Sequence, residues 1–170
     1  VAGSGNNITL NTSTNNFAAA VVITSGRNVA ITDEDAIDLG AATVSGTYSV
    51  TAGGAVTDSG TQEITGVTTI SASGQDVTLN TSTNNFAAAV GITGAAVTVV
   101  DEDAIDLGAA TVSGTYGITA GGAVTDSGTQ EITGVTTLAA GSGNDITLDT
   151  STNNFAAAVG ITSGRNVAII

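Results

Sequence analysis

The feature that most constrains this chain is an internal repeat of 69 residues. The segment NTSTNNFAAAV begins at Asn11 and returns unchanged at Asn80, and a third copy at Asp149 differs only in its first residue. Between these copies, the segment DEDAIDLGAATVSGTY starts at Asp33 and again at Asp101. A chain of 170 residues built in this way is an array of similar units, so its period is interpreted before any motif.

The residue types in the repeat are those of β-strands and tight corners. Val, Ile and Thr favour strands, whereas Gly, Asn, Asp and Ser favour turns. Proline and tryptophan are absent, aromatic residues make up 3%, and 23 residues are glycine. Apolar and hydroxyl residues alternate, as in Ile146-Thr147-Leu148, which gives each strand one apolar face. This regular pattern argues against low-complexity disorder.

Aligning the short Val, Ile and Leu runs divides the repeat into three units of about 23 residues. This pattern predicts an all-β fold, a parallel β-helix (solenoid) with three strands and about 23 residues per turn. Copies of the repeat would stack three turns apart, with Phe17, Phe86 and Phe155 as corner or core residues about 14 Å apart. The predicted turns are residues 22–44, 45–67, 68–90, 91–112, 113–135 and 136–159, with partial turns at 1–21 and 160–170.

Residues 1–170 are expected to form a single β-helix array without separate domains. Val1 lies inside a predicted turn and Ile170 ends a predicted strand without a polar cap, which suggests an excerpt of a longer chain. Helical structure is expected at most as one short turn in Asp33–Leu39, where acidic residues precede an apolar run.

The charge excludes several classes of partner. The net charge is −13, lysine is absent, and Arg27 and Arg165 are the two basic residues. Such a surface repels nucleic acid and anionic membranes. The apolar stretch Ala18–Ile23 is far shorter than the roughly 18 residues of a membrane span. The expected partners are neighbouring repeats of the same chain or fibre, with self-association into filaments, and neither nucleic acid nor membrane insertion.

Acidic residues gather at two predicted corners, Asp33-Glu34-Asp35 with Asp38, and Asp101-Glu102-Asp103 with Asp106. The prediction places these clusters three turns apart at the same corner. Calcium binds six to eight oxygen atoms, some of which such corners can supply. A calcium-stiffened stalk is therefore an alternative to solvated corners, and calcium is the one ion considered as a partner.

The segment Ala140–Leu148 resembles one nonapeptide of the calcium-binding RTX repeats. Those sites need nonapeptides in tandem, and here the next nine residues are unrelated. The other copies place Asn7 and Asp76 at the acid position. We interpret this segment as a glycine-rich corner that leads into a strand.

Catalysis is not indicated. Glycoside hydrolysis needs two suitably spaced carboxylates in a cleft, and the predicted corners are too short to wall one. Histidine and lysine are absent, and Tyr48 and Tyr116 are the two tyrosines. Hydroxyl rows such as Thr12–Thr14 suggest ice binding, but they do not recur in every turn of one predicted face. No catalytic, cofactor-binding or metal residue is assigned, and a carbohydrate-active β-helix and an ice-binding protein are further alternatives.

Two phrases of the repeat resemble a known family, DLGAATVSGTYSVTAGGAVTDSG (38–60) and GSGNDITLDTSTNNFAAAV (141–159). They are similar to the repeat regions of filamentous haemagglutinin-like giant surface proteins of Gram-negative bacteria, which use two-partner secretion. The resemblance implies a right-handed parallel β-helix without enzymatic activity or cofactor. It also implies an extracellular or cell-surface location and a role as the structural shaft of an adhesin or biofilm matrix fibre.

Overall fold

A computed structural model describes residues 2–170 as a coil of 21 β-strands without a helix, so this part of the chain offers no helix that could cross a membrane. The all-β prediction is confirmed, and Asp33–Leu39 forms a bend and a strand instead of a helical turn. The strands are β1 (Ile8–Leu10), β2 (Val21–Gly26), β3 (Val29–Asp33), β4 (Ile37–Val44), β5 (Tyr48–Ala52), β6 (Val56–Asp58), β7 (Gln62–Ile64), β8 (Thr68–Ser71), β9 (Val77–Leu79), β10 (Asn85–Phe86), β11 (Val90–Gly94), β12 (Val97–Asp101), β13 (Ile105–Val112), β14 (Tyr116–Ala120), β15 (Val124–Asp126), β16 (Gln130–Ile132), β17 (Thr136–Ala139), β18 (Ile146–Leu148), β19 (Asn154–Phe155), β20 (Val159–Ser163) and β21 (Val167–Ile169).

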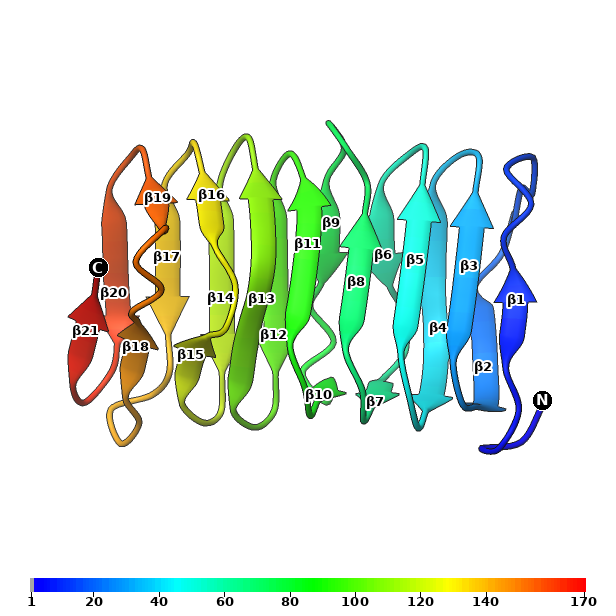
Figure 1. The fold of residues 1–170 in the computed structure, drawn as a ribbon, viewed down its shortest axis with the longest axis horizontal. Coiled ribbons are helices and arrows are strands. Elements are labelled where there is room, and N and C mark those ends of the chain that lie inside the picture. Colours follow the sequence, from blue (N-terminus) through cyan, green and yellow to red (C-terminus); the bar gives the residue numbers. More distant parts are fainter. Residues whose placement is uncertain (1) are drawn as a thin grey trace.

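The strands form two parallel sheets that the chain visits in alternation. Sheet A follows the order β1-β3-β5-β8-β11-β13-β15-β18-β21, with β16 and β19 beside it. Sheet B follows β10-β7-β4-β6-β9-β12-β14-β17-β20, with β2 paired to β4. In Figure 1, sheet A runs upward in front and sheet B runs downward behind while the chain advances from right to left. The coil is therefore right-handed, as parallel crossovers nearly always are, and the predicted parallel β-helix is confirmed.

One turn takes about 20 residues, fewer than the 23 expected. In sheet A, Val29 pairs with Tyr48, Tyr48 with Thr68 and Thr68 with Val90, which are separations of 19, 20 and 22 residues. The coil makes about eight such turns. The expectation was too long because polar segments such as Ser59–Thr61 are not corners. They are bends within one side of the coil, since β6 before the bend and β7 after it both pair with the single strand β4.

The sides of the coil are of two kinds. A short side holds one strand, such as β11, β12, β14 or β17. A long side holds the eight-residue strand β4 or β13, or two strands around a bend, as in β6/β7, β9/β10, β15/β16 and β18/β19. From β11 onward the order is short, short, long, short, long, short, long. One 69-residue repeat is therefore seven sides, or three and a half turns.

An odd number of sides places successive copies of the repeat on opposite sheets. Asn85–Phe86 of β10 pairs with β7 in sheet B, whereas the equivalent Asn154–Phe155 of β19 pairs with β16 in sheet A. The prediction that the copies stack three turns apart at one corner, with Phe86 and Phe155 in line, is wrong. Of the polar segments counted as corners, those between β6 and β7 and between β18 and β19 are bends within one side, whereas Asp33–Asp35 is a true corner between the two sheets. Counting the bends as corners hid the half turn.

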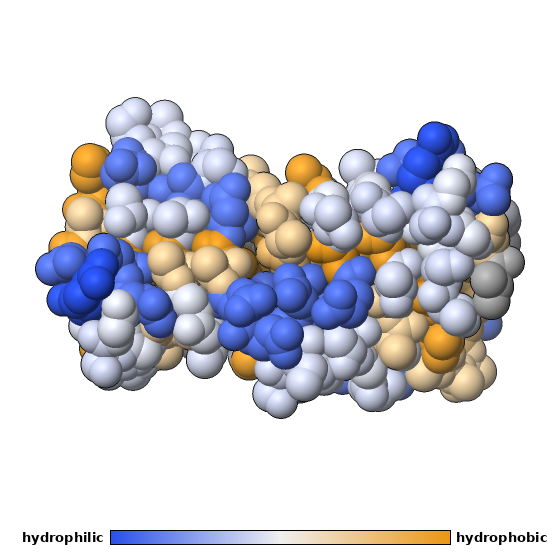
Figure 2. Space-filling model, turned by 90° about the horizontal axis from the view of Figure 1, so that it is seen from below, coloured by the Kyte–Doolittle hydropathy of each residue, from blue (hydrophilic) through white to orange (hydrophobic). Residues whose placement is uncertain are grey.

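Because two short sides follow each other once in every repeat, the long sides change sheets at that point. They lie in sheet B from β4 to β10 and in sheet A from β13 to β19. Short strands β3, β5, β8 and β11 consequently follow one another in sheet A, a stretch here called the hollow, and a recess lies on it at β8 and β11. The long sides behind it, β4, β6/β7 and β9/β10, form the bulge of sheet B. The upper outline of Figure 2 is indented near the middle of the coil.

The inside of the coil is one continuous apolar core. Inward and outward residues alternate, as in β5, where Tyr48, Val50 and Ala52 are buried and Ser49 and Thr51 are exposed. The same alternation holds in β18, as its sequence predicted. Stacking of turns is what buries these faces, because a single turn has no other surface to cover them.

The corners of adjacent turns are in backbone contact. A Cβ atom placed on Gly53 or Gly121 would overlap the carbonyl oxygen of Glu34 or Glu102, one turn earlier. Only a residue without a side chain fits there, because the neighbouring backbone cannot move away without breaking the ladder. The recurring Gly-Gly pair therefore reflects close stacking of the turns.

Candidate functional site

Each acidic corner turns its first carboxylate inward. Asp33 and Asp101 are the last residues of β3 and β12, and each is 2% exposed. Asp101 accepts the backbone N–H of Phe86 through Oδ2 and that of Asp103 through Oδ1, both at 2.9 Å. Asp33 makes the matching pair of bonds in the first copy. These carboxylates tie the acidic corner to the repeated NNF segment.

The environment of Asp101 is that of a structural carboxylate. Burial raises its pKa, and the N–H groups of Phe86 and Asp103 oppose the rise. The negative charges of Asp103 and Glu102 add to it. Because both carboxylate oxygens already accept backbone hydrogen bonds, this side chain is engaged by the coil itself.

The remaining acids of the corner point to different partners. Asp35 accepts a hydrogen bond from Asn16 Nδ2 at 2.8 Å, Asp38 accepts one from the Ser59 hydroxyl at 2.7 Å, and Glu34 is exposed. Within residues 2–170 no three His, Cys, Asp or Glu side chains are grouped as metal ligands would be. Calcium binding therefore stays a prediction from the sequence.

The two acidic clusters also lie at opposite edges of the coil. The cluster at Asp33 follows β3 of sheet A, and the cluster at Asp101 follows β12 of sheet B. Chain direction places these corners at the top and the bottom of Figure 1, respectively. The prediction that they share one corner three turns apart is wrong, again because the repeat contains an odd number of sides.

The glycine-rich corner before β18 uses its acid to hold an arginine. Asp145 accepts hydrogen bonds from Nε and Nη2 of Arg165, each at 2.8 Å, and this pair is a surface salt bridge. The hydrogen bond from Arg165 is the main reason that the pKa of Asp145 is lowered to about 2. In the first copy Asn7 accepts a hydrogen bond from Arg27 Nε at 3.0 Å. These contacts favour the interpretation of this segment as a corner.

A buried polar network anchors the bends of the long sides, and sequence reasoning missed it. Asn84, which is fully buried, accepts the N–H of Gln62 at 2.9 Å and donates to the Asp58 carboxylate at 2.6 Å. The side-chain amide of Gln62 donates to the carbonyl oxygens of Gly40 at 2.9 Å and Gly60 at 2.7 Å. These bonds satisfy backbone groups that the bend removes from the ladder.

The second repeat rebuilds this network on the other sheet with Asp126, Asn153 and Gln130. The available signal was the spacing between the glutamine and the buried asparagine, 22 residues in one copy and 23 in the other, about one turn. Asn84 belongs to the repeated NTSTNNF segment. That segment, around which the chain is organised, therefore anchors a bend.

The two tyrosines lie in the core. Tyr48 is 0% and Tyr116 is 1% exposed, and burial raises the pKa of both. Neither hydroxyl group stands at a surface that a polysaccharide could reach. The alternative of a carbohydrate-active β-helix gains no support from them.

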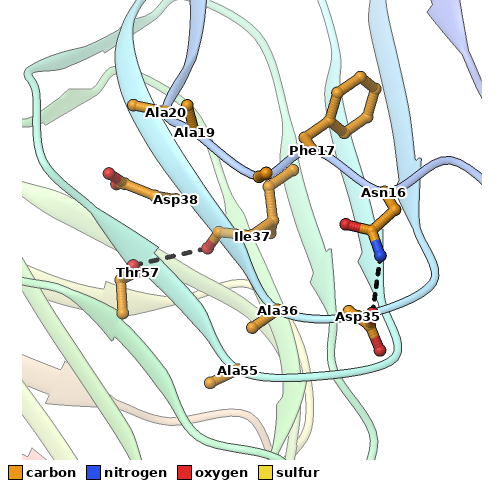
Figure 3. A pocket seen from close by; sticks show the side chains of 11 residues that line it. Asn16, Phe17, Ala19, Ala20, Asp35, Ala36, Ile37, Asp38, Ala55 and Thr57 are labelled. Carbon is orange, nitrogen blue, oxygen red and sulfur yellow. Dashed lines mark hydrogen bonds between the residues drawn. The ribbon is translucent and has the colours of Figure 1, made fainter.

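A shallow recess of about 370 Å³ lies beside the first change of sheets (Figure 3). Its wall includes a run of alanines, and Asn16 and Asp35 meet at one end. Asp38 lies at the other end, beyond Ile37, whose carbonyl accepts a long hydrogen bond from Thr57 at 3.5 Å. The two carboxylates therefore do not face each other across the recess, as a glycosidase pair would.

A second recess, of about 570 Å³, lies where β8 and β11 of the hollow meet β13 and the bend at Ser127–Gly128, and its lining is neutral. Thr12–Thr14 lie at a turn, so the expected hydroxyl row is not there. Hydroxyl groups line up in the hollow instead, because outward residues of neighbouring strands are in register. One column is Thr32, Thr51, Ser71 and Thr93, and the column beside it is Ala30, Ser49, Thr69 and Gly91.

The fold and its internal polar networks define a repeat protein of the β-solenoid class. A family described as repeats of unknown function (DUF5649) matches residues 26–93 and 94–162, most of the chain, and the chain belongs to this family. Each matched segment contains seven sides, β3 to β11 in the first and β12 to β20 in the second. Comparisons with curated proteins and with solved structures gave no match.

Proposed function

We propose that this chain is a rigid, non-catalytic shaft, part of a secreted bacterial adhesin or extracellular matrix fibre. The observation that carries the proposal is the unbroken ladder of parallel strands, from β1 to β21 in sheet A and from β2 to β20 in sheet B. Its hydrogen bonds run along the axis of the coil. Bending or stretching the rod therefore requires breaking the ladder across a turn.

The polar groups support a structural role. Asp101, Asn84 and Gln62 are the kind of buried polar residues that often mark active sites. Here each is bonded to backbone groups of a corner or bend, and the equivalent residues of the next copy do the same. Polar side chains that bond to the backbone of the coil in every repeat are suited to a spacer whose length grows with the number of copies.

The location outside a Gram-negative cell is drawn from the resemblance to haemagglutinin-like repeats. An antibody against the folded chain should label intact cells of the source bacterium. Labelling only after the cells are opened would refute the extracellular part of the proposal.

Small-angle X-ray scattering tests the shaft itself. Eight turns at about 4.8 Å give a rod of about 38 Å, and each added repeat should lengthen it by about 17 Å at constant cross-section. Scattering from chains with one or two extra repeats, inserted as whole 69-residue units, should show this linear growth. A cross-section that grows with the number of repeats would contradict the proposal.

The hydroxyl columns of the hollow favour ice binding as a second candidate. Regularly spaced threonines on a rigid sheet can order water in rows, and the strand spacing sets the distance between them. The test is thermal hysteresis and the shape of ice crystals grown with the chain at millimolar concentration. Substitution Thr51→Leu should reduce any hysteresis, and unmodified crystal growth in the wild-type chain would remove this candidate.

A further inference from the structure

We propose that copies of this shaft nest side by side, with the bulge of one copy seated in the hollow of the next. The inference rests on the proposed shaft function and adds the contact surface and the partner, which is a second copy of the same chain. Two observations carry it, the change of long sides between sheets and the neutral floor of the hollow.

The hollow and the bulge occupy the same stretch of the coil. Short sides β3, β5, β8 and β11 lie in sheet A, with a recess at β8 and β11, while long sides β4, β6/β7 and β9/β10 lie in sheet B directly behind them. Every turn in this stretch combines one short and one long side. The long side extends outward on sheet B, and the short side stays closer to the axis on sheet A. Two parallel rods in the same axial register therefore present the bulge of one rod to the hollow of the other.

The charges fit this contact. The bulge exposes Glu63 on β7, in register with Thr43 of β4 and Asn85 of β10. The floor of the hollow offers only neutral outward residues, such as Ser49 and Thr69. In a chain of net charge −13, contact between two acidic faces is unfavourable, and this pair of faces avoids it.

The contact is open-ended. Sheet A of one copy meets sheet B of the next, so the interface is heterologous and a third copy can add in the same way. In the following repeat the hollow passes to sheet B and the bulge to sheet A, because the long sides change sheets. The two rods exchange roles every three and a half turns, and the contact continues along the array. The expected assembly is a sheet of parallel rods.

The first test uses charge. The double substitution Ser49→Glu and Thr69→Glu places two carboxylates opposite Glu63 and should weaken lateral association by about tenfold or more. The matched control is Ser73→Glu, which adds charge at an exposed corner between the two faces. Sedimentation velocity over a range of salt concentrations gives the association, and circular dichroism confirms that each variant is folded. Equal association of the wild-type chain and a folded double variant would overturn the proposal.

The second test identifies the faces in contact. The chain has no cysteine, so single cysteines report proximity without background. Ser49 and Thr43 flank the same corner on opposite sheets. A mixture of Ser49→Cys and Thr43→Cys chains should form mixed disulfides on oxidation, whereas Ser73→Cys with Thr43→Cys should not. Equal cross-linking in both mixtures would overturn the proposed contact.

Electron microscopy separates failure of this inference from failure of the shaft itself. Side-by-side rods in the wild-type sample, lost in the double variant, would support nesting. Isolated rods at every concentration and salt would overturn nesting and leave the shaft function intact. Particles without a rod shape would overturn both.

Discussion

At the scale of single residues, the polar side chains of this coil serve its backbone. Corners and bends interrupt the strand ladder and leave N–H and C=O groups that need partners. Asp101 accepts two such N–H groups, and Gln62 donates to carbonyl oxygens on both sides of a bend. Buried polar groups placed in this way fix where the chain turns, because an unpaired backbone group inside would be expensive.

Removing the Asp101 carboxylate should therefore destabilise the fold. The substitution Asp101→Ala leaves the N–H groups of Phe86 and Asp103 without acceptors, which costs about 1–3 kcal/mol for each group that stays buried. Asp103→Ala is the matched control, because Asp103 only accepts one long bond of 3.3 Å from Asn85. Urea unfolding should place the control within about 0.5 kcal/mol of the wild-type chain. Equal loss in both variants would contradict the role given to Asp101.

The Asp145–Arg165 pair predicts a defined pH dependence. The folded-state pKa of Asp145 is lowered to about 2 from an ordinary value of 3.8, so its stabilising contribution is present above about pH 4 and is lost as pH falls toward 2. The variant Arg165→Gln should melt at a lower temperature than the wild-type chain at pH 6, and the gap should close at pH 2. Salt should narrow the gap at pH 6, because the pair is exposed. A gap independent of pH would show that the ion pair is not its source.

At the scale of the element, corners are the tightest points of the structure. Gly121 sits where any side chain would overlap the carbonyl oxygen of Glu102 in the neighbouring turn, whereas a Cβ on Gly143 would meet nothing within 4 Å. The corner at Gly121 is therefore packed against the neighbouring turn, whereas the corner at Gly143 projects from the stack. Glycine thus has two roles in one repeat: it allows close stacking of turns at Gly121 and forms part of an open corner at Gly143.

The comparison of two glycine substitutions tests this difference. Gly121→Ala should lower the free energy of unfolding by about 2 kcal/mol or more, because the overlapping atom belongs to backbone that is held by the ladder. Gly143→Ala should stay within about 0.5 kcal/mol of the wild-type chain. Thermal and urea unfolding of both variants provide the measurement. A larger loss from Gly143→Ala than from Gly121→Ala would mean that the turns are not stacked as described.

Strands, their inward faces and their parallel stacking could be predicted because their signals are local. Alternation as in Ile146-Thr147-Leu148 and glycine pairs at corners both report on a few neighbouring residues. The number of sides could not be predicted, since Ser59–Thr61 has the composition of a corner whether the chain turns there fully or only bends. Whether this segment is a corner or a bend depends on β4, the strand of the neighbouring turn with which both β6 and β7 pair. The inward turn of Asp101 was missed for a related reason, because acidic residues are normally expected outside.

At the scale of the whole molecule, the half turn in each repeat can be measured directly. Spin labels at Thr69→Cys and Thr137→Cys occupy equivalent positions of two copies, on β8 of sheet A and β17 of sheet B. Their distance should exceed the axial separation of about 17 Å, because the labels lie on opposite faces. The control pair Thr51→Cys and Thr111→Cys lies three turns apart in one column of sheet A and should give about 14 Å. Similar distances for both pairs would contradict the seven-sided repeat.

Calcium distinguishes a plain shaft from a calcium-stiffened one. Because the inward carboxylates of Asp33 and Asp101 already accept backbone hydrogen bonds, we expect millimolar calcium to shift the melting temperature by about 1 °C or less relative to a chelator. Calorimetry with magnesium as the control ion gives the answer. A rise of several degrees that is specific to calcium would favour the stiffened stalk.

Because each repeat has seven sides, the direction in which the far end of the array faces depends on whether the number of copies is odd or even. Recombination between nearly identical units can add or delete one, and each single event would rotate everything beyond it by half a revolution about the axis. A group that had projected toward one neighbour would then project toward the opposite one. Two events restore the original direction, so gain and loss of units would act as a two-position rotary switch on whatever the shaft carries.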